Sequence, residues 1–247
     1  MWNLEFITRE QFKEHVKETI KKYGEILNPI NLCRFNHNII DPIKLTFDSK
    51  VYKKSMEQII VDEIGRQRDK SNNNAIGYFH QNIFKYINGC DVPEQGWDVV
   101  YTRPDGVIIN VEMKNKHNTM NSSSSQKTYM RMMNQIINTN DFCYLVEVIA
   151  RHSQNIVWTI SVDGTQMRNE RIKRVSIDKF YEEITGDRLA FKKICDNLPQ
   201  MIDEIISENE ELTIGRDTVL DELYAIDPNY LKSLYLLAFE TYEGFNQ

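Results

Sequence analysis

The stretch from Trp97 to Lys116 constrains this 247-residue chain more than any other, because it predicts a β-hairpin. β-branched and aromatic residues dominate 97–102, and apolar residues alternate with polar ones over 107–114. Between the two strands, residues 103–106 read Arg-Pro-Asp-Gly. Proline and aspartate suit the second and third positions of a type I turn, and glycine suits the left-handed position that follows. The sequence therefore predicts a three-residue hairpin loop with a bulge at its glycine.

This turn also predicts which side chains share a face of the sheet. If Arg103 pairs with Val107, counting outward places Asp98 directly opposite Glu112. Alternate residues of a strand point to opposite faces, so Lys114 lies on the face of Glu112. An apolar row is expected behind that face, formed by Val107, Ile109, Val111 and Met113.

The predicted face has the chemistry of a metal-dependent site. Two carboxylates this close repel each other unless a cation lies between them, and hard oxygen ligands suit Mg²⁺. A lysine ammonium on the same face can hold or activate a water or stabilise charge at a phosphate. Acidic and basic residues on the solvated face of a hairpin are also common without any function. The agreement of strand face, opposing aspartate and the polar segment after Lys114 favours catalysis.

The pattern of Asp98 followed by Glu112-Met113-Lys114 on the next strand resembles the site of the PD-(D/E)xK nuclease superfamily, which includes many type II restriction endonucleases. The phrases RQRDKSNNN, GYFHQNIFKYI and VEMKNKHNTMNSSS further resemble a narrower group that reads 5′-GGNCC. The residue before Asp98 is Trp97 where the superfamily motif has proline, a frequent departure. The resemblance implies an α/β fold: a restriction-endonuclease-like mixed β-sheet of four or five strands flanked by helices, with a C-terminal helical extension.

The resemblance also implies an activity. It predicts Mg²⁺-dependent, sequence-specific hydrolysis of double-stranded DNA that leaves 5′-phosphate ends. Asp98, Glu112 and the Met113 carbonyl would hold the metal, and Lys114 would position the attacking water. A palindromic DNA site would be matched by a homodimer, with a cognate DNA methyltransferase as the functional companion.

Two auxiliary positions and two alternative functions stay open. Gln81 stands where relatives often carry a helix glutamate near the metal, and Glu63 is an alternative auxiliary acid. The same fold could belong to a structure-specific repair or junction nuclease. It could also belong to a non-catalytic DNA-binding module, although retention of Asp98, Glu112 and Lys114 argues against that reading.

Two polar segments near the hairpin are candidates for DNA contact. Residues 66–74 are expected to form a polar loop in which Asn74 caps a helix over 75–88. Residues 115–127 follow the catalytic strand, and a flexible linker is the alternative there. Such side chains can reach phosphates or base edges. The candidates are Arg66, Arg68, Lys70, Asn72, Asn73, Lys116, His117, Asn118, Ser122, Gln126, Lys127 and Arg131.

The remaining elements follow from hydrophobic periodicity. Residues 28–50 are expected to be irregular structure with a short turn of helix, and 168–174 to be a basic cluster that is either phosphate-facing or a solvated edge. The apolar segment 142–150 predicts a buried strand parallel to the catalytic one, and 156–162 extends the sheet. Helices are predicted over 9–24, 51–68, 124–138, 176–185, 188–207, 216–225 and 229–242. The buried stripe of 124–138 is expected to be Met130, Met133, Ile136 and Ile137.

Charge and composition set the domain division. Residues 196–247 hold twelve acidic and two basic residues, so 1–195 carry a net +4 of the total of −6. We therefore expect a nuclease domain with N-terminal helices over 1–195, and an acidic helical extension over 196–247 packed on it or on a partner subunit. No apolar run approaches the length of a membrane span and the N-terminus lacks a signal pattern, so a cytoplasmic protein is expected.

Overall fold

The computed structural model describes residues 2–117, 119–208 and 215–241, and these form two compact units. Unit 1 combines residues 1–20 with 76–208, and unit 2 combines 21–75 with 209–247, as far as each is described. Helices α1 (Arg9–Leu27) and α4 (Met56–Asn82) each run through a boundary between them. No helix of the described residues has the length and apolar character needed to cross a membrane.

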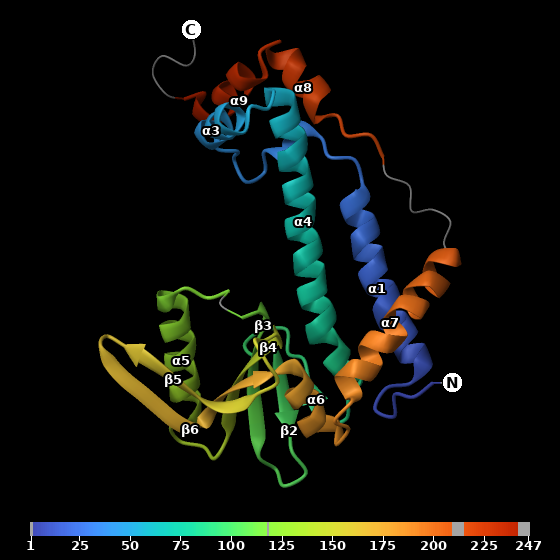
Figure 1. Ribbon diagram of the computed structural model, residues 1–247, viewed down its shortest axis with the longest axis vertical. Coiled ribbons are helices and arrows are strands. Elements are labelled where there is room, and N and C mark those ends of the chain that lie inside the picture. Colours follow the sequence, from blue (N-terminus) through green and yellow to red (C-terminus); the bar gives the residue numbers. More distant parts are fainter. Residues whose placement is uncertain (1, 118, 209–214, 242–247) are drawn as a thin grey trace. The chain divides into compact units, whose positions relative to one another are not determined.

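Unit 1 is built on a six-stranded mixed sheet in the order β1-β2-β3-β4-β6-β5 (Figure 1). Strands β3, β4 and β6 run parallel, whereas the other neighbouring pairs are antiparallel. The α/β fold and the parallel pairing of β3 with β4 are therefore confirmed. The strands are β1 (Cys90–Asp91), β2 (Val99–Thr102), β3 (Ile108–Lys116), β4 (Phe142–Ile149), β5 (Asn155–Val162) and β6 (Thr165–Ser176).

The sheet has six strands where four or five were expected, chiefly because the basic sequence of β6 does not predict a strand. Its positive residues, Arg168, Arg171, Lys173 and Arg174, occur at both odd and even positions, so the sequence lacks the apolar period of two that predicts a strand. Pairing with β4 on one side and β5 on the other stabilises it. The Arg171 guanidinium donates to the Ile136 carbonyl at 3.0 Å, so this arginine supports the end of a helix.

The hairpin has the predicted turn and register. Val99 pairs with Val111, and the Arg103 N–H donates to the Val107 carbonyl at 2.9 Å. The Gly106 N–H closes the turn on the Arg103 carbonyl at 2.9 Å, and its φ of +84° is the left-handed conformation that glycine adopts readily.

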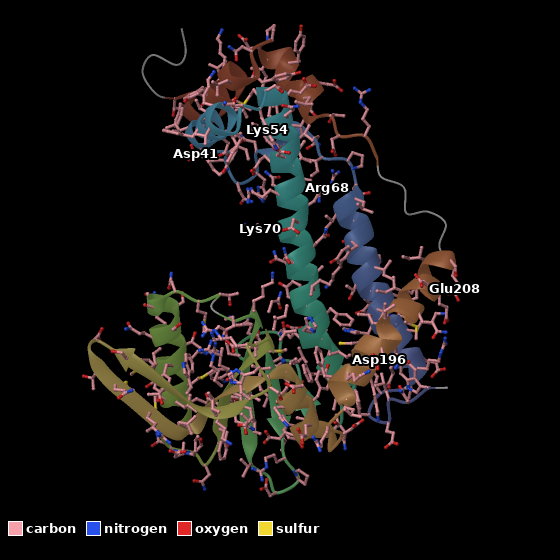
Figure 2. All side chains as sticks on the ribbon, viewed as in Figure 1. Asp41, Lys54, Arg68, Lys70, Asp196 and Glu208 are labelled. Atoms are coloured by element: carbon pink, nitrogen blue, oxygen red, sulfur yellow. The ribbon has the colours of Figure 1, made fainter. Side chains whose placement is uncertain are left out.

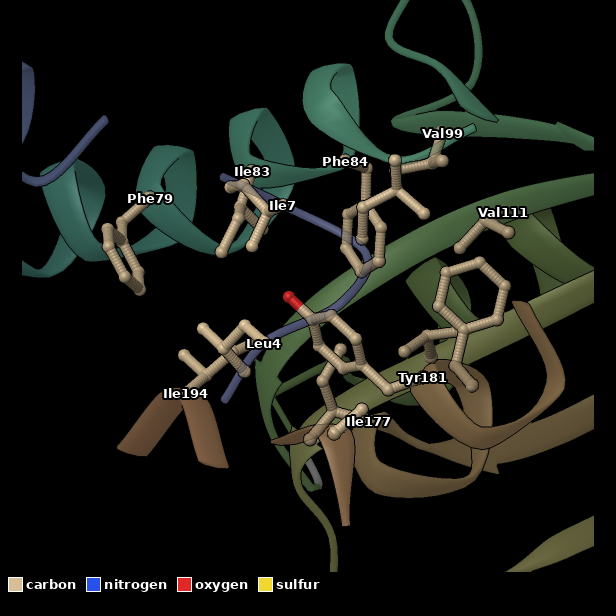
Figure 3. Packing of buried hydrophobic residues seen from close by; sticks show 14 of the residues in the cluster. Leu4, Ile7, Phe79, Ile83, Phe84, Val99, Val111, Ile177, Tyr181 and Ile194 are labelled. Carbon is tan, nitrogen blue, oxygen red and sulfur yellow. The ribbon is translucent and has the colours of Figure 1, made fainter. Parts of the chain in front are cut away.

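Helices cover both faces of the sheet in unit 1. On one face, Val99 and Val111 share a core with Phe84 and Tyr181 (Figure 3). That core includes residues of α6 (Ile177–Thr185) and α7 (Ala190–Ser207). On the other face lies α5 (Ser122–Ile136), the connection between β3 and β4. Ile109 and Val111 are fully buried and Met113 is partly buried on the first face, which confirms the apolar row for these residues.

The buried stripe of α5 differs from the expected one. Tyr129, Met132 and Ile136 are buried, whereas Met130 and Ile137 are exposed. The buried residues recur at three- and four-residue spacing, as expected for an amphipathic helix. Which side of the helix is buried depends on the sheet beneath it. The sequence did not reveal that side, because its methionines and isoleucines lie on more than one side of the helix.

Unit 2 is helical and has its own core. It contains α2 (Leu32–Phe35), α3 (Pro42–Tyr52), α8 (Val219–Ile226), α9 (Tyr230–Phe239) and the first part of α4. The expectation of irregular structure over 28–50 is wrong for α3. Asp41 caps that helix by accepting from the N–H groups of Ile43 and Lys44, and Pro42 follows at the first helical position.

The expected loop over 66–74 is also wrong, because α4 continues through it to Asn82. Its short polar side chains bond back onto the helix: Ser71 Oγ donates to the Gln67 carbonyl, and Asn73 Nδ2 donates to the Asp69 carbonyl. Extending an existing helix through such residues costs only tenths of a kcal/mol each, roughly. Asn74 is therefore a helix residue and caps nothing.

The C-terminal helices occur where periodicity predicts them, with ends that differ by a few residues. The expected domain boundary at residue 195 falls inside α7, and α8 and α9 share a core with residues of 21–75. Packing of the tail on a partner subunit stays a prediction.

Candidate active site

Asp98 lies at the start of the hairpin, one residue beyond the β2–β3 ladder. Its backbone N–H donates to the Val111 carbonyl at 3.0 Å, and its Oδ2 accepts the Met113 N–H at 2.7 Å. The carboxylate is therefore fixed against the backbone of the opposite strand, beside Glu112. The predicted neighbourhood of Asp98 and Glu112 is confirmed, although the two residues do not form a regular ladder pair.

Glu112 is the centre of a charged group on the α5 face of the sheet. Its Oε1 accepts from Lys114 Nζ at 2.7 Å, and its Oε2 accepts from Arg131 Nη1 at 3.1 Å. The Arg131 guanidinium also lies 3.9 Å from the centre of the Trp97 ring. The structure thus brings together both predicted acids, the predicted lysine, and an arginine that had been predicted only as a DNA contact.

The electrostatics of Asp98 are those of a partly buried acid next to another acid. Burial raises the pKa of the Asp98 carboxyl, and the charge of Glu112 adds to that rise. The Met113 N–H and the cations Lys114 and Arg131 act in the opposite direction on this pKa without cancelling the rise. A further positive charge at this position would relieve the cost of ionising Asp98.

The two auxiliary candidates have different surroundings. Gln81, near the end of α4, donates from Nε2 to the Asp98 carbonyl at 3.1 Å and so braces the backbone of that residue. Glu63 belongs to unit 2, where it is buried and accepts from Arg66 Nε at 2.7 Å. A role for either residue beside a bound metal stays a prediction.

A buried acid, Glu147, lies next to Lys114 and is surrounded by the partly buried side chains of His117 and Arg174. Lys114 and Glu147 are neighbours in the β3–β4 register, and Glu147 is only 1% exposed. Its carboxylate pairs with Arg174 Nη2 and lies 3.1 Å from His117 Nδ1. Sequence reasoning missed Glu147, although one acid in the otherwise apolar segment FCYLVEVIA is the signal of a buried, paired charge.

Three of the candidates on α4, Arg66, Arg68 and Lys70, line a pocket of about 480 Å³ within unit 2, together with Arg34 and Lys44. Arg68 and Lys70 project from this helix (Figure 2). Arg68 is held by Asp217 through two bonds of 2.9 and 2.7 Å, whereas Lys70 forms no ion pair with any described residue. Asn72 is partly buried, and Asn73 bonds to Asp69.

The candidates after the catalytic strand are placed as follows. Lys116 is exposed at the end of β3, and Asn118 lies outside the described residues. Ser122 and Lys127 are exposed on α5, and Gln126 Nε2 donates to the Ser161 carbonyl at 3.1 Å. Their contacts with DNA stay predictions.

Comparison with known proteins identifies relatives over most of the chain. The family model for the Eco47II restriction endonuclease matches residues 4–207. The type II restriction enzyme Sau96I of Staphylococcus aureus is 27% identical over 257 residues, which cover 94% of this chain and 97% of that protein. The type II restriction enzyme Eco47II of Escherichia coli is 27% identical over 216 residues, covering 83% of this chain and 89% of that protein.

Proposed function

Because the chain belongs to the Eco47II restriction endonuclease family, we propose that it is a type II restriction endonuclease that cleaves double-stranded DNA at a specific sequence. The observation that carries the proposal is the convergence of Asp98, Glu112 and Lys114 on one face of the hairpin. Each of the three has a chemical role in phosphodiester hydrolysis. Glu112 and Lys114 lie on β3 and Asp98 is hydrogen-bonded to the backbone of that strand, which suits a site that must hold its geometry.

A divalent cation, with Mg²⁺ as our choice, fits the oxygen donors of this site. Asp98 and Glu112 offer two carboxylates, and the Met113 carbonyl is a third hard oxygen ligand from the same strand. Burial and, to a lesser extent, the charge of Glu112 raise the pKa of Asp98, so a cation bound beside it would favour its ionised form. A bound cation supplies positive charge at the scissile phosphate and acidifies water.

The lysine and arginine of the site act on the negative charge of the phosphate. Lys114 Nζ lies within hydrogen-bond distance of Glu112, so it can reach a phosphate oxygen or a water held at the same carboxylate. Arg131 stands on the other side of that carboxylate. Attack of the water opposite the leaving 3′-oxygen leaves a 5′-phosphate and a 3′-hydroxyl.

The recognition sequence we propose is 5′-GGNCC, on the resemblance of three sequence phrases to the group that reads it. Lys70 is the candidate to test first, because Arg68 is already engaged by Asp217. Loss of a base contact lowers the discrimination against a one-base variant by about 1–3 kcal/mol. Loss of a phosphate contact weakens all sequences alike.

The proposal also covers the assembly and its cellular setting. A palindromic DNA site implies a homodimer, and a cleaving enzyme of this class implies a DNA methyltransferase that protects the host. The four cysteines are free thiols, which supports a reducing, cytoplasmic location. Sedimentation of the protein with and without a duplex tests the dimer.

Digestion of a fully sequenced DNA in Mg²⁺, with the ends mapped, tests the function. Discrete fragments that end at GGNCC sites with 5′-phosphates are the expected result. Discrete fragments at another sequence would contradict only the recognition sequence. Nicking that follows DNA structure would indicate a repair or junction nuclease, and binding without cleavage would indicate a non-catalytic module.

A further inference from the structure

A second pocket of unit 1 opens directly beside the catalytic lysine. Its volume is about 420 Å³, and Lys114, Glu147 and Arg174 line it with polar side chains of α5 and β5. The polar contributors include Ser122, Ser125, Thr159 and Ser161. Neither Asp98 nor Glu112 lines this pocket, so it is separate from the carboxylate pair but shares Lys114 with it.

Two cations and one acid line this pocket. The acid, Glu147, pairs with Arg174, and His117 Nδ1 lies between the two, 2.8 Å from Arg174 Nη2 and 3.1 Å from Glu147 Oε1. The other cation, Lys114, pairs with Glu112 beyond the pocket. Arg174 Nε is buried and has no hydrogen-bond partner among the described residues. An unsatisfied, buried guanidinium N–H costs free energy unless a ligand or a water accepts from it.

The strand order places this positive charge one step away from the catalytic carboxylates. Lys114 is on β3, its register neighbour Glu147 is on β4, and Arg174 is on β6 beside Leu145. Neighbouring strands are about 4.8 Å apart, so the pocket extends the solvated face by roughly 10 Å from β3 towards β6. A group bound there lies next to one bound at Lys114, along the same surface.

We propose that this pocket binds the DNA phosphodiester adjacent to the scissile one on the same strand, with Arg174 as its principal cation. This inference rests on the proposed function. The unpartnered Arg174 Nε–H and the serine and threonine hydroxyls can donate to the oxygens of a phosphodiester. The apolar wall of Met120 and Trp158 suits the neighbouring deoxyribose. Glu147 holds the Arg174 side chain in place, so it is a positioning residue.

The serine run at the start of α5 supplies a matched test. Ser122 and Ser125 line the pocket, whereas Ser123 and Ser124 are exposed and do not. We expect aspartate to be tolerated at all four positions, because they lie in the first turn of a helix, where acidic residues are favourable. In Ca²⁺, S122D and S125D are expected to weaken binding of a cognate duplex by about tenfold or more, through repulsion of the phosphate. S123D and S124D should stay within about threefold of the parent.

Methylphosphonate substitution identifies the phosphate concerned. A methylphosphonate is an uncharged replacement of one phosphodiester, and it is placed at each position around the scissile bond in turn. When the methylphosphonate lies next to the scissile bond, S125D should bind that duplex within about threefold of the parent's affinity, because the charge that the aspartate repels is gone. If all four aspartate variants bind alike, or if no neighbouring position removes the penalty, the inference is wrong.

Arg174 is tested as a double variant, because removing it alone would leave a buried carboxylate unpaired. E147Q/R174Q keeps a neutral, hydrogen-bonding pair, and circular dichroism checks its fold. For this variant, the slope of the logarithm of the DNA-binding constant against the logarithm of salt concentration should be shallower than for the parent by about one unit. That is the change expected for one lost phosphate contact. An unchanged slope would overturn the role of Arg174.

The same series separates this inference from the proposed function. If the parent cleaves its site but S125D and S124D bind DNA equally well, only the pocket assignment fails. If the parent binds DNA without cleaving it in Mg²⁺, the proposed function fails. The binding comparisons still decide then whether the pocket holds a phosphate.

Discussion

At the scale of single residues, Glu112 is the proposed metal ligand that would have to give up the most hydrogen bonds to bind a cation. Without a metal its two oxygens are taken by Lys114 and Arg131. Asp98, in contrast, is held by a backbone N–H that a metal does not displace. At the metal site proposed above, a cation held by Glu112 would release Lys114 and Arg131 towards phosphate, whereas Asp98 would keep its hydrogen bond to the backbone.

The first prediction concerns the two carboxylates. Asp98→Asn and Glu112→Gln should abolish Mg²⁺-dependent cleavage, because each removes a negative charge from the metal site. The fold should survive, since the amide oxygen introduced by Asp98→Asn can still accept from the Met113 N–H. DNA binding without metal should be unchanged or tighter, because less negative charge faces the phosphates. Cleavage by either variant within about tenfold of the parent rate would contradict the assignment.

The second prediction separates Lys114 from Lys116. Lys114→Ala should lower the single-turnover cleavage rate by about 10²-fold or more, through loss of charge at the water or phosphate. Lys116→Ala, at an exposed position two residues further along β3, should mainly weaken DNA binding and reduce its salt dependence. The reverse pattern would show that the catalytic lysine is misassigned.

The third prediction follows from the raised pKa of Asp98. A carboxyl with a higher pKa in the folded than in the unfolded state destabilises the fold when it ionises. This cost is absent well below pH 3.8, the ordinary value, and is complete above the folded-state pKa. The stability of the parent therefore falls between acidic and neutral pH by an amount that Asp98→Asn does not lose. The melting temperature of Asp98→Asn should accordingly rise relative to that of the parent as the pH is raised across this range.

Added divalent cation provides the control for this comparison. It should raise the melting temperature of the parent at neutral pH and have a smaller effect on the Asp98→Asn protein. An equal response of the two proteins would mean that the cation binds elsewhere.

At the scale of elements, α4 shows how a polar segment can be a helix. Asn74 is expected to behave as an interior helix residue, for which alanine is favoured by about 0.5 kcal/mol. Asn121 is a true cap, because its side chain accepts from the Ser124 N–H at 2.8 Å. Asn74→Ala should therefore raise the free energy of unfolding, and Asn121→Ala should lower it by about 1 kcal/mol. Urea titrations measure both, and a loss with Asn74→Ala would support a loop at 66–74.

At the scale of the whole molecule, helices α8 and α9 of the acidic C-terminal segment contribute to the core of unit 2. Leu223 is fully buried in unit 2 with residues such as Ile60 and Phe35, whereas its neighbour Tyr224 is 57% exposed. Unit 2 therefore needs both of its sequence segments to complete its core.

The fifth prediction tests this completion of unit 2. Leu223→Ala should destabilise the protein by about 2–5 kcal/mol, the range for a leucine truncated in a core. Tyr224→Ala should change stability by no more than about 0.5 kcal/mol, as at other surface positions. Similar effects of the two substitutions on urea unfolding would mean that α8 does not pack as described.

The sequence alone determined the features whose causes are local. The Arg-Pro-Asp-Gly turn predicted the hairpin register, and period-two alternation predicted that Ile109 and Val111 face the core while Glu112 and Lys114 face outward. These predictions succeeded because turn conformation and strand alternation depend on adjacent residues. The parallel strand β4 was predicted for a similar reason, since its apolar run is typical of burial on both faces.

Tertiary structure alone decided the features whose stabilising partners are distant in sequence. β6 is a strand because β4 and β5 pair with it, and α4 continues through 66–74 because helical segments on both sides stabilise it. The pairing of Glu147 with Arg174 and His117, and the pocket beside Lys114, need three strands in register. Long-range pairing of this kind leaves no periodic trace in a single sequence, because each side chain's environment is supplied by residues far along the chain.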